Sequence, residues 1–168
     1  HPTGDIFIVL HQMGNHGPAY YKRYPPLFEK FTPVCKTNQL EECSKQEIDN
    51  AYDNAILYTD YFLSKVIAFL KSNDGRFETG LFYVSDHGES LGEGGLYLHG
   101  LPYALSHETQ RHVPAIMWFG ANNDDVDVSA LQRVAGNKYS HDNLFHTIFG
   151  LLEVESGVYR KDLDINQI

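Results

Sequence analysis

The sequence is short of positive charge, of long apolar runs and of cysteine, and each shortage narrows what the protein can be. Thirteen Lys and Arg residues stand against 22 Asp and Glu residues, which gives a formal net charge of −9. Such an acidic chain is a poor match for nucleic acid or for a polybasic role at a membrane surface. A phosphate-bearing ligand would therefore need a bound cation to supply positive charge.

The apolar runs are too short to cross a membrane. No stretch approaches the roughly 18 apolar residues of a membrane-spanning helix, and no charged segment followed by an apolar one opens the chain. The first apolar run, at residues 5–10, starts almost at the first residue. Since a buried strand is rarely the first element of a domain, we expect a piece of a longer chain.

Two cysteines, Cys35 and Cys43, lie eight positions apart on either side of a polar stretch. This separation suits a small disulfide-closed loop, and such a bond would indicate an oxidising compartment such as the periplasm. Two free thiols are the alternative, and the spacing by itself leaves both open.

Common catalytic motifs are also missing. The sequence contains neither the G-x-x-x-x-G-K-[ST] phosphate loop nor the G-x-G-x-x-G dinucleotide loop. Ser85 and Ser90 do not lie in the G-x-S-x-G pattern of serine hydrolases. Nucleotide binding and serine hydrolysis therefore have no support in the sequence.

Three short apolar runs, at 5–10, 80–85 and 114–119, predict strands buried on both faces. Helices are expected between and after them. Ser44 and Glu47 form a capping box ahead of a long apolar pattern at helical spacing, so a long helix should begin there.

The "NDG" triplet at 73–75 should end this helix, a second helix is expected from Ser140, and a shorter one over roughly 127–135. The proline- and tyrosine-rich segment 17–33 predicts an ordered loop over the sheet. The alternation of strands and helices is typical of an α/β fold with a mainly parallel sheet flanked by helices.

Acidic and imidazole side chains cluster where two of the predicted strands end. In α/β folds, ligands collect at the carboxyl ends of the strands. His16 follows the first strand, and Asp86 and His87 directly follow the second. Gly88 allows the backbone to turn, so that the two neighbours can reach one metal, and His99 returns to the same edge behind a glycine-rich loop.

Asp oxygen and His nitrogen are preferred zinc ligands, so His16, Asp86, His87 and His99 could hold one zinc or two. Each also has a plainer explanation. The Asp-His pair could form a turn and a cap, the two loop histidines could pack or bond to a carbonyl, and Glu93 could be a solvated loop residue. The expected convergence of the four at one edge favours the metal site.

Five stretches carry a resemblance to a known family: "GNHGPAYYKRYPP", "KFTPVCKTNQLEEC", "YDNAILYTDYFLSKVI", "YVSDHGESLGEGGLYLHGLPYA" and "YSHDNLFHTIFGLLEVES". The chain resembles bacterial phosphoethanolamine transferases of the lipid A type, which include the mobile colistin resistance enzymes. The chain departs from the family pattern at Asn15, where the family has Ser, and at Gly94, where it has Asn. The resemblance implies an alkaline phosphatase/sulfatase-like fold, with residues 1–168 as the C-terminal part of a periplasmic catalytic domain.

The resemblance also implies roles for individual residues. Asp86 and His87 would bind a first zinc together with a glutamate and a threonine nucleophile upstream of this chain. His16 and His99 would bind a second zinc or act on the phosphoryl group, by stabilising its charge or protonating the leaving group. Further implied features are substrate contacts by Glu89, His16, His99 and Pro102, and a disulfide between Cys35 and Cys43.

The implied activity is zinc-dependent transfer of phosphoethanolamine from phosphatidylethanolamine to a lipid A phosphate, through a threonine intermediate. The enzyme would act at the periplasmic face of the bacterial inner membrane and confer polymyxin resistance. The 168 residues alone are expected to be inactive, because the nucleophile lies elsewhere.

Three alternatives remain open. The acceptor could be a core sugar, a glucan or a protein in place of lipid A. The enzyme could be a sulfatase or phosphodiesterase of the same superfamily, although neither Cys35 nor Cys43 lies in the C-x-P-x-R type of motif that sulfatases need. The domain could also be a binding module without catalytic activity.

Overall fold

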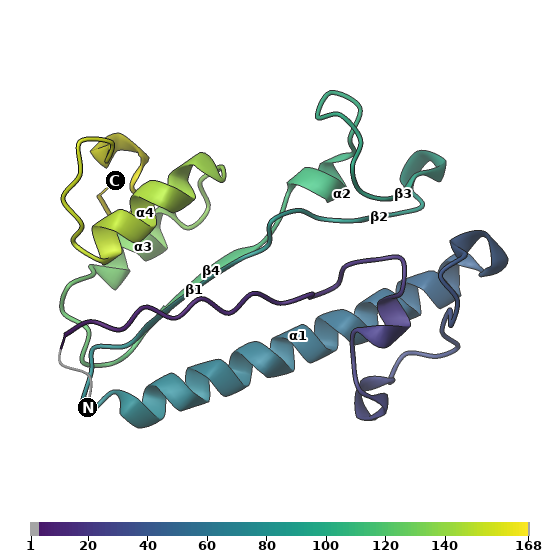
Figure 1. Ribbon diagram of the computed structural model, residues 1–168, viewed down its shortest axis with the longest axis horizontal. Helices are drawn as coiled ribbons and strands as arrows, with labels where there is room; N and C mark the ends of the chain where they lie inside the picture. Colours follow the sequence, from purple (N-terminus) through teal and green to yellow (C-terminus); the bar gives the residue numbers. More distant parts are fainter. Residues whose placement is uncertain (1–3, 168) are drawn as a thin grey trace. The chain divides into compact units, whose positions relative to one another are not determined.

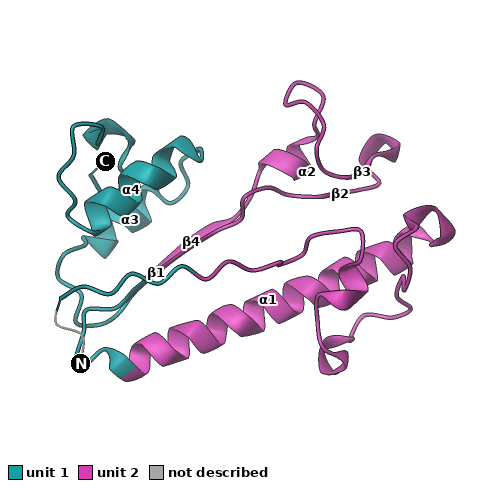
Figure 2. Ribbon diagram, in the orientation of Figure 1, with its two compact units in different colours: residues 1–9, 73–80, 118–168 teal, residues 10–72, 81–117 magenta. Residues whose placement is uncertain are grey.

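The computed structural model describes residues 4–167, which form two compact units (Figures 1 and 2). Unit 2 consists of residues 10–72 and 81–117, and the other described residues form unit 1. Within residues 4–167, no helix combines the length and the apolar character needed to cross a membrane.

The predicted long helix is α1, Lys45–Asn73, and its start is the predicted capping box. The backbone N–H of Ser44 donates to the Glu47 carboxylate at 2.8 Å, and the N–H of Glu47 donates to the Ser44 hydroxyl at 3.3 Å. These bonds satisfy two donors that a helix start leaves without partners. The first half of α1 buries Ile48 and Ala51 in the core of unit 2.

The segment ahead of α1 packs against that helix, whereas the sequence predicted a loop over the sheet. It contains two 3₁₀ helices, Tyr20–Lys22 and Pro26–Phe28. The buried side chain of Asn54 on α1 accepts hydrogen bonds from the N–H groups of Lys30 and Phe31 at 2.7 and 2.9 Å. The Asn54 amide offers both a donor and an acceptor, and it binds the backbone of this loop as a neighbouring strand would. The loop is therefore ordered by a side chain of α1.

The disulfide between Cys35 and Cys43 is confirmed, with an S–S distance of 2.15 Å. It closes the loop that contains the 3₁₀ helix Leu40–Glu42. Cys35 is buried beside Tyr20 in the core of unit 2. The crosslink therefore joins the loop to the same core that α1 covers.

Two of the three predicted strands form, β1 at Gly80–Val84 and β4 at Ala115–Phe119, and they pair with each other. Hydrogen bonds join Thr79 to Gly120 at one end of the pair and Ser85 to Pro114 at the other. The pair is thus antiparallel, although the sequence favoured parallel neighbours. A shorter antiparallel hairpin of β2, Ser90–Leu91, and β3, Tyr97–Leu98, lies beyond β1.

The strand predicted at residues 5–10 does not form in the part of the chain that the structure describes. These residues are extended but belong to neither strand pair. Their large apolar side chains, Ile6 to Leu10, are 51–73% exposed. The apolar run is typical of a buried strand, but residues 4–167 provide no partner strand that would bury it.

Helix α2, Glu108–Arg111, belongs to unit 2, and α3, Val128–Val134, and α4, Asp142–Leu151, belong to unit 1. Of these helices, α3 and α4 lie where the sequence predicted them, whereas the short α2 was not predicted. The C-terminal 3₁₀ helices Lys161–Leu163 and Ile165–Gln167 pack on α4. Helices and sheet together give the α/β composition expected from the sequence.

We expect Asn54→Ala to lower the free energy of unfolding by about 2–4 kcal/mol. The change leaves the N–H groups of Lys30 and Phe31 without their acceptor in a site where Asn54 is 0% exposed. Urea denaturation measures the difference. Asp53→Asn, one residue earlier and exposed, is the matched control and should stay within about 0.5 kcal/mol of the parent. Equal stabilities of the two variants would contradict the role given to Asn54.

Candidate metal and phosphoryl site

The glycine-rich loop after β1 is the turn of the β2–β3 hairpin, and it determines which residues face each other. In this hairpin Ser90 pairs with Leu98 and Leu91 with Tyr97. The turn takes positive φ values at Gly92, Gly94 and Gly95, a backbone conformation that favours glycine. Continuing the register by one pair brings the residue before β2 opposite the residue after β3, which places Glu89 beside His99.

The Asp-His pair lies in a tight turn between β1 and that hairpin. The Asp86 carboxylate accepts from the N–H of His87 at 3.0 Å, and the Ser85 hydroxyl donates to the His87 carbonyl at 2.7 Å. The backbone at Gly88 passes so close to α2 that an added Cβ would lie 1.9 Å from the Thr109 carbonyl oxygen. Glycine is therefore required for close approach, which holds the turn and its histidine against α2.

His16 comes from the loop ahead of α1. The Nε–H of Arg23 donates to the His16 carbonyl at 2.7 Å. The neighbouring Asn15 accepts from the Thr59 hydroxyl of α1 at 3.0 Å and donates to the Tyr52 carbonyl at 3.3 Å. The loop that carries this histidine is thus tied both to itself and to α1.

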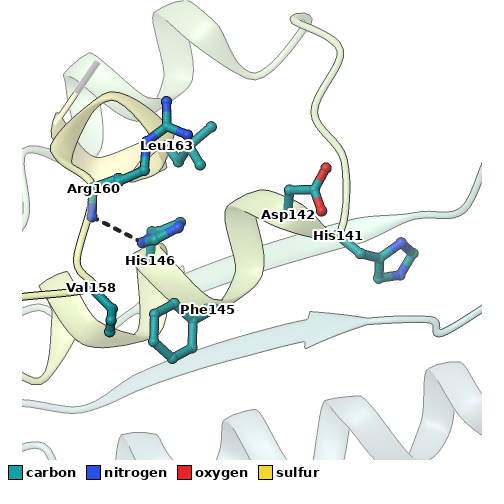
Figure 3. Close-up of a pocket in the computed structure, with 7 residues that line it drawn as sticks. All are labelled: His141, Asp142, Phe145, His146, Val158, Arg160 and Leu163. Carbon is teal, nitrogen blue, oxygen red and sulfur yellow. Dashed lines mark hydrogen bonds between the residues drawn. The ribbon is translucent and has the colours of Figure 1, made fainter.

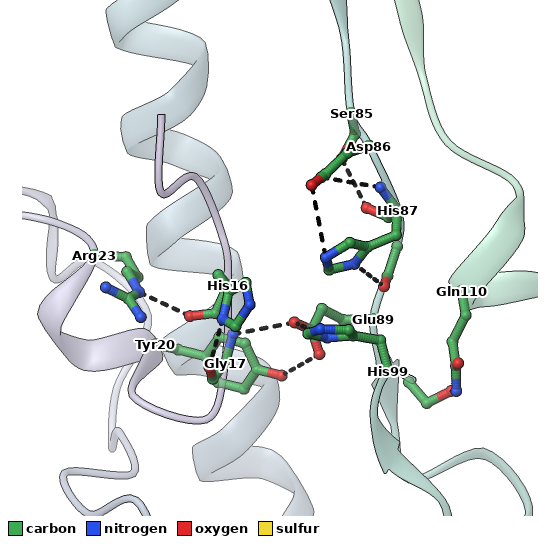
Figure 4. Close-up of polar contacts among 12 residues, drawn as sticks. His16, Gly17, Tyr20, Arg23, Ser85, Asp86, His87, Glu89, His99 and Gln110 are labelled. Carbon is green, nitrogen blue, oxygen red and sulfur yellow. Dashed lines mark hydrogen bonds and ion pairs between the residues drawn. The ribbon is translucent and has the colours of Figure 1, made fainter. Parts of the chain in front are cut away.

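The structure brings His16, His87 and His99 together (Figure 4). One ring nitrogen of each lies within 4.8 Å of the others. The rings of His87 and His99 stack at 3.8 Å between centroids, and the His16 ring lies edge-on, 4.8 Å from that of His99. The convergence that the sequence predicted for these three side chains is present in unit 2.

The hydrogen bonds of the three rings leave the same nitrogen available in each. Nδ1 of His16 is 2.7 Å from the Gly17 carbonyl oxygen, and Nδ1 of His87 is 2.9 Å from the Gly88 carbonyl oxygen. Nδ1 of His99 is 3.0 Å from Glu89 Oε1. Carbonyl and carboxylate oxygens only accept hydrogen bonds, so each Nδ1 carries the proton.

In the neutral form of each ring, Nε2 therefore presents its lone pair, the state that a metal requires. The donor set of the site, with three oriented imidazoles, fits a zinc ion. Asp86 lies beside this set, since its Oδ2 is 3.9 Å from Nε2 of His87. Its side chain is 83% exposed, so an ion can reach its carboxylate from solvent.

Glu89 is a buried acid at the base of the site. Its carboxylate accepts from the Gly17 N–H at 3.1 Å, from the Tyr20 hydroxyl at 3.2 Å and from Nδ1 of His99. Burial, and after it the charge of Glu89, raises the pKa of Tyr20, so the phenol keeps the proton that it donates. Three donors from two segments of the chain thus stabilise one buried charge.

The sequence reasoning missed Gly17 and Tyr20. Both lie in the "HGPAYY" stretch directly after His16, and the only signal for them was that a polar loop follows a predicted strand. Glu93, expected in solvent, accepts from the N–H of Leu91 at 2.7 Å and so braces the hairpin turn. Pro102 is exposed in the loop after His99, and its substrate contact stays a prediction.

Unit 1 has a separate open hollow of about 570 Å³ along α4 (Figure 3). Phe145, Val158 and Leu163 supply much of its wall. His146 in this wall already accepts from the Arg160 N–H through Nδ1 at 3.0 Å, which supports a structural role. Among residues 4–167, possible metal ligands converge in two groups, the histidine cluster of unit 2 and the exposed acids Glu78, Asp124 and Asp125 of unit 1. Exposed acids often cluster without a metal, so we place the candidate site at the histidine cluster.

The chain is similar over nearly its whole length to proteins of known sequence. Phosphoethanolamine transferase EptA of Salmonella typhimurium is 50% identical over 171 residues, which cover 99% of this chain and 31% of that protein. Phosphatidylethanolamine transferase Mcr-2 from Escherichia coli is 49% identical over 153 residues, which cover 91% of this chain and 27% of that protein. The chain thus spans less than a third of the length of these relatives, and the expected resemblance to such transferases is confirmed.

Solved structures show the same fold. The soluble domain of lipooligosaccharide phosphoethanolamine transferase A from Neisseria meningitidis matches with a TM-score of 0.89 and 45% identity, over 94% of this chain and 48% of that one. The C-terminal periplasmic domain of EptC from Campylobacter jejuni matches with a TM-score of 0.83 and 50% identity, over 90% and 48%. The profile of the Sulfatase family matches residues 1–154, and the chain therefore belongs to the sulfatase family.

Proposed function

We propose that this chain is part of a zinc-dependent phosphoethanolamine transferase that modifies lipid A at the periplasmic face of the inner membrane. The donor would be phosphatidylethanolamine, and the modification would confer polymyxin resistance. Relatives named as phosphoethanolamine or phosphatidylethanolamine transferases support the reaction class. The observation that carries the proposal is the convergence of three imidazoles whose Nδ1–H groups are all bonded to acceptor oxygens.

The charge of the site supports the need for a cation. Three imidazole rings lie beside the carboxylates of Asp86 and Glu89, in a chain of formal net charge −9. These carboxylates would oppose the approach of a phosphodiester anion. A bound zinc would supply the positive charge and lower the pKa of a coordinated hydroxyl group.

The histidine nitrogens could serve one metal position or two. One ring nitrogen of each histidine lies within 4.8 Å of the others, a bound that includes the spacing of about 3.4 Å between two ligands of one tetrahedral zinc. The resemblance to the transferases suggests how the residues divide between two positions. We assign Asp86 and His87 to the first zinc. The Nε2 atoms of His16 and His99 would then face either a second zinc or the phosphoryl oxygens.

In the proposed reaction, the hydroxyl of a threonine outside these 168 residues gives up its proton, and its oxygen bonds to the phosphorus of the donor. The bond to the diacylglycerol oxygen breaks, and that oxygen takes up a proton as diacylglycerol leaves. A lipid A phosphate oxygen then displaces the threonine oxygen, which regains a proton. With Nε2 also protonated, His16 and His99 would donate to the phosphoryl oxygens or pass that proton to a leaving oxygen, while their Nδ1–H bonds keep the rings oriented. On this proposal, the 168 residues alone are inactive.

We expect His87→Ala and Asp86→Ala to lower zinc affinity at least about tenfold in the full-length protein, because each removes a direct ligand. Zinc content by elemental analysis and affinity by chelator competition measure the effect. His112→Ala is the matched control, because the side chain of His112 is 79% exposed and lies outside the cluster. A full-length protein that holds no zinc, or variants that hold as much as the control, would refute the metal site.

We expect zinc chelation to abolish the addition of phosphoethanolamine to lipid A by the full-length protein, and added zinc to restore it. His16→Ala and His99→Ala should lower kcat by about 10²–10³-fold, the usual cost of losing one group that stabilises transferring charge. Mass spectrometry of lipid A incubated with phosphatidylethanolamine measures both effects.

The same assay separates the rival functions. Transfer to a core sugar, a glucan or a protein with lipid A unmodified would replace the acceptor and keep the reaction. Hydrolysis of a sulfate ester without any transfer would favour a sulfatase. Zinc binding without turnover of any of these substrates would indicate a binding module without catalytic activity.

A further inference from the structure

We propose that Glu89 is a positioning residue, which orients His16 and His99 and does not touch the substrate. The inference rests on the proposed function, because the two histidines are the groups that would meet the second zinc or the phosphoryl oxygens. Similarity to transferases had suggested that Glu89 lies against the bound phosphoethanolamine. The contacts of its carboxylate point to a different use.

Burial is the first reason. Glu89 is 7% exposed, so its charge has little access to water or to a ligand in solution. A charge in such a place is tolerated only when hydrogen bonds satisfy it. Oε1 accepts from Gly17 and His99, and Oε2 accepts from Tyr20. Both oxygens are therefore engaged before any substrate arrives.

The identity of the donors is the second reason. Nδ1–H of His99 donates directly to Glu89, which directs Nε2 of that ring away from the carboxylate. The N–H of Gly17 donates to the same oxygen, and the Gly17 carbonyl in turn accepts from Nδ1 of His16. One carboxylate thus fixes one ring directly and a second ring through a single glycine, as Figure 4 shows.

The third histidine provides an internal comparison. His87 is bonded through Nδ1 to the Gly88 carbonyl and not to Glu89. Its position is held instead by the turn that Gly88 makes against α2. A defect at Glu89 should therefore affect His16 and His99 and leave His87 in place, a pattern that general unfolding would not produce.

The test compares Glu89→Gln with Glu89→Ala in the full-length protein. A glutamine keeps an oxygen that can accept from His99 and Gly17, and an amide that can donate to the Tyr20 oxygen. Positioning therefore predicts rescue by Gln. Glu89→Gln should keep kcat within about fivefold of the parent, whereas Glu89→Ala should lose about 10–100-fold with little change in KM.

A substrate contact predicts another pattern. If Glu89 bound the ammonium group of phosphoethanolamine, Gln and Ala would both raise KM, and they would do so for amine-bearing phosphodiester donors but not for amine-free ones. Equal losses in Glu89→Gln and Glu89→Ala, confined to amine-bearing donors, would overturn the positioning role. Glu93→Gln is the matched control, because Glu93 lies in the same hairpin and its carboxylate accepts from the N–H of Leu91, a bond that glutamine can keep.

A second readout does not depend on turnover or on zinc. Nitrogen NMR of histidine-labelled, metal-free protein reports which ring nitrogen carries the proton. His99 should be the Nδ1–H tautomer in the parent and in Glu89→Gln, and a mixture in Glu89→Ala, with His87 unchanged in all three. An unchanged His99 signal in a folded Glu89→Ala protein would overturn the inference.

The two proposals fail in different ways. A parent protein without zinc or transfer activity would refute the proposed function, and the tautomer of His99 would still decide the role of Glu89. Tyr20→Phe separates the two oxygens of Glu89, because it removes only the donor to Oε2. The His99 tautomer should stay Nδ1–H in this variant, because Oε1 still accepts from that ring.

Discussion

The buried carboxylate of Glu89 is the interaction on which the geometry of the histidine site depends. A negative charge in the interior is costly by itself, and here donors from the loop after His16 and from the segment after β3 offset that cost. Because these donors come from segments more than sixty positions apart in the chain, satisfying the charge also brings the two segments together. The hydrogen bonds that stabilise the Glu89 carboxylate are thus also the ones that assemble the site.

Two features of the backbone allow Glu89 and His99 to meet. The β2–β3 register pairs Ser90 with Leu98, so a shift by one residue would turn His99 to the opposite face from Glu89. The glycines of the hairpin turn allow that register through their positive φ values. Gly88 performs a different task, since close approach to Thr109 and not φ requires it. A stretch that looks merely flexible in the sequence therefore contains glycines with distinct physical roles.

Local signals in the sequence predicted α1, α3, α4, β1 and β4 and the convergence of His16, His87 and His99, whereas the hydrogen bonds between distant segments were not predicted. Ser44 and Glu47 predicted the start of α1 because a capping box is made by residues three apart. The Asp-His pair was found because ligands gather where strands end. The bonds of Gly17 and Tyr20 to Glu89 could not be foreseen, because they join segments whose proximity the sequence does not encode locally. The prediction of a strand at 5–10 failed for a related reason, because an apolar pattern predicts burial but does not identify the strand that would cover it.

Electrostatics connects the acidic composition to the chemistry. Carbonyl and carboxylate acceptors at Nδ1 turn each Nε2 toward the site, where the lone pair of a neutral ring can bind a metal, and the acceptors bring no positive charge of their own. Arg23, the basic residue drawn beside the rings, donates its Nε–H to the His16 carbonyl (Figure 4). The carboxylates of Asp86 and Glu89 oppose the approach of a phosphodiester anion. A bound divalent ion would reverse the local charge, and Asp86 and the histidines are the side chains that would hold it. The proposed metal dependence is thus a consequence of how the imidazoles are oriented, and it would apply to any anionic phosphate ester that enters the site.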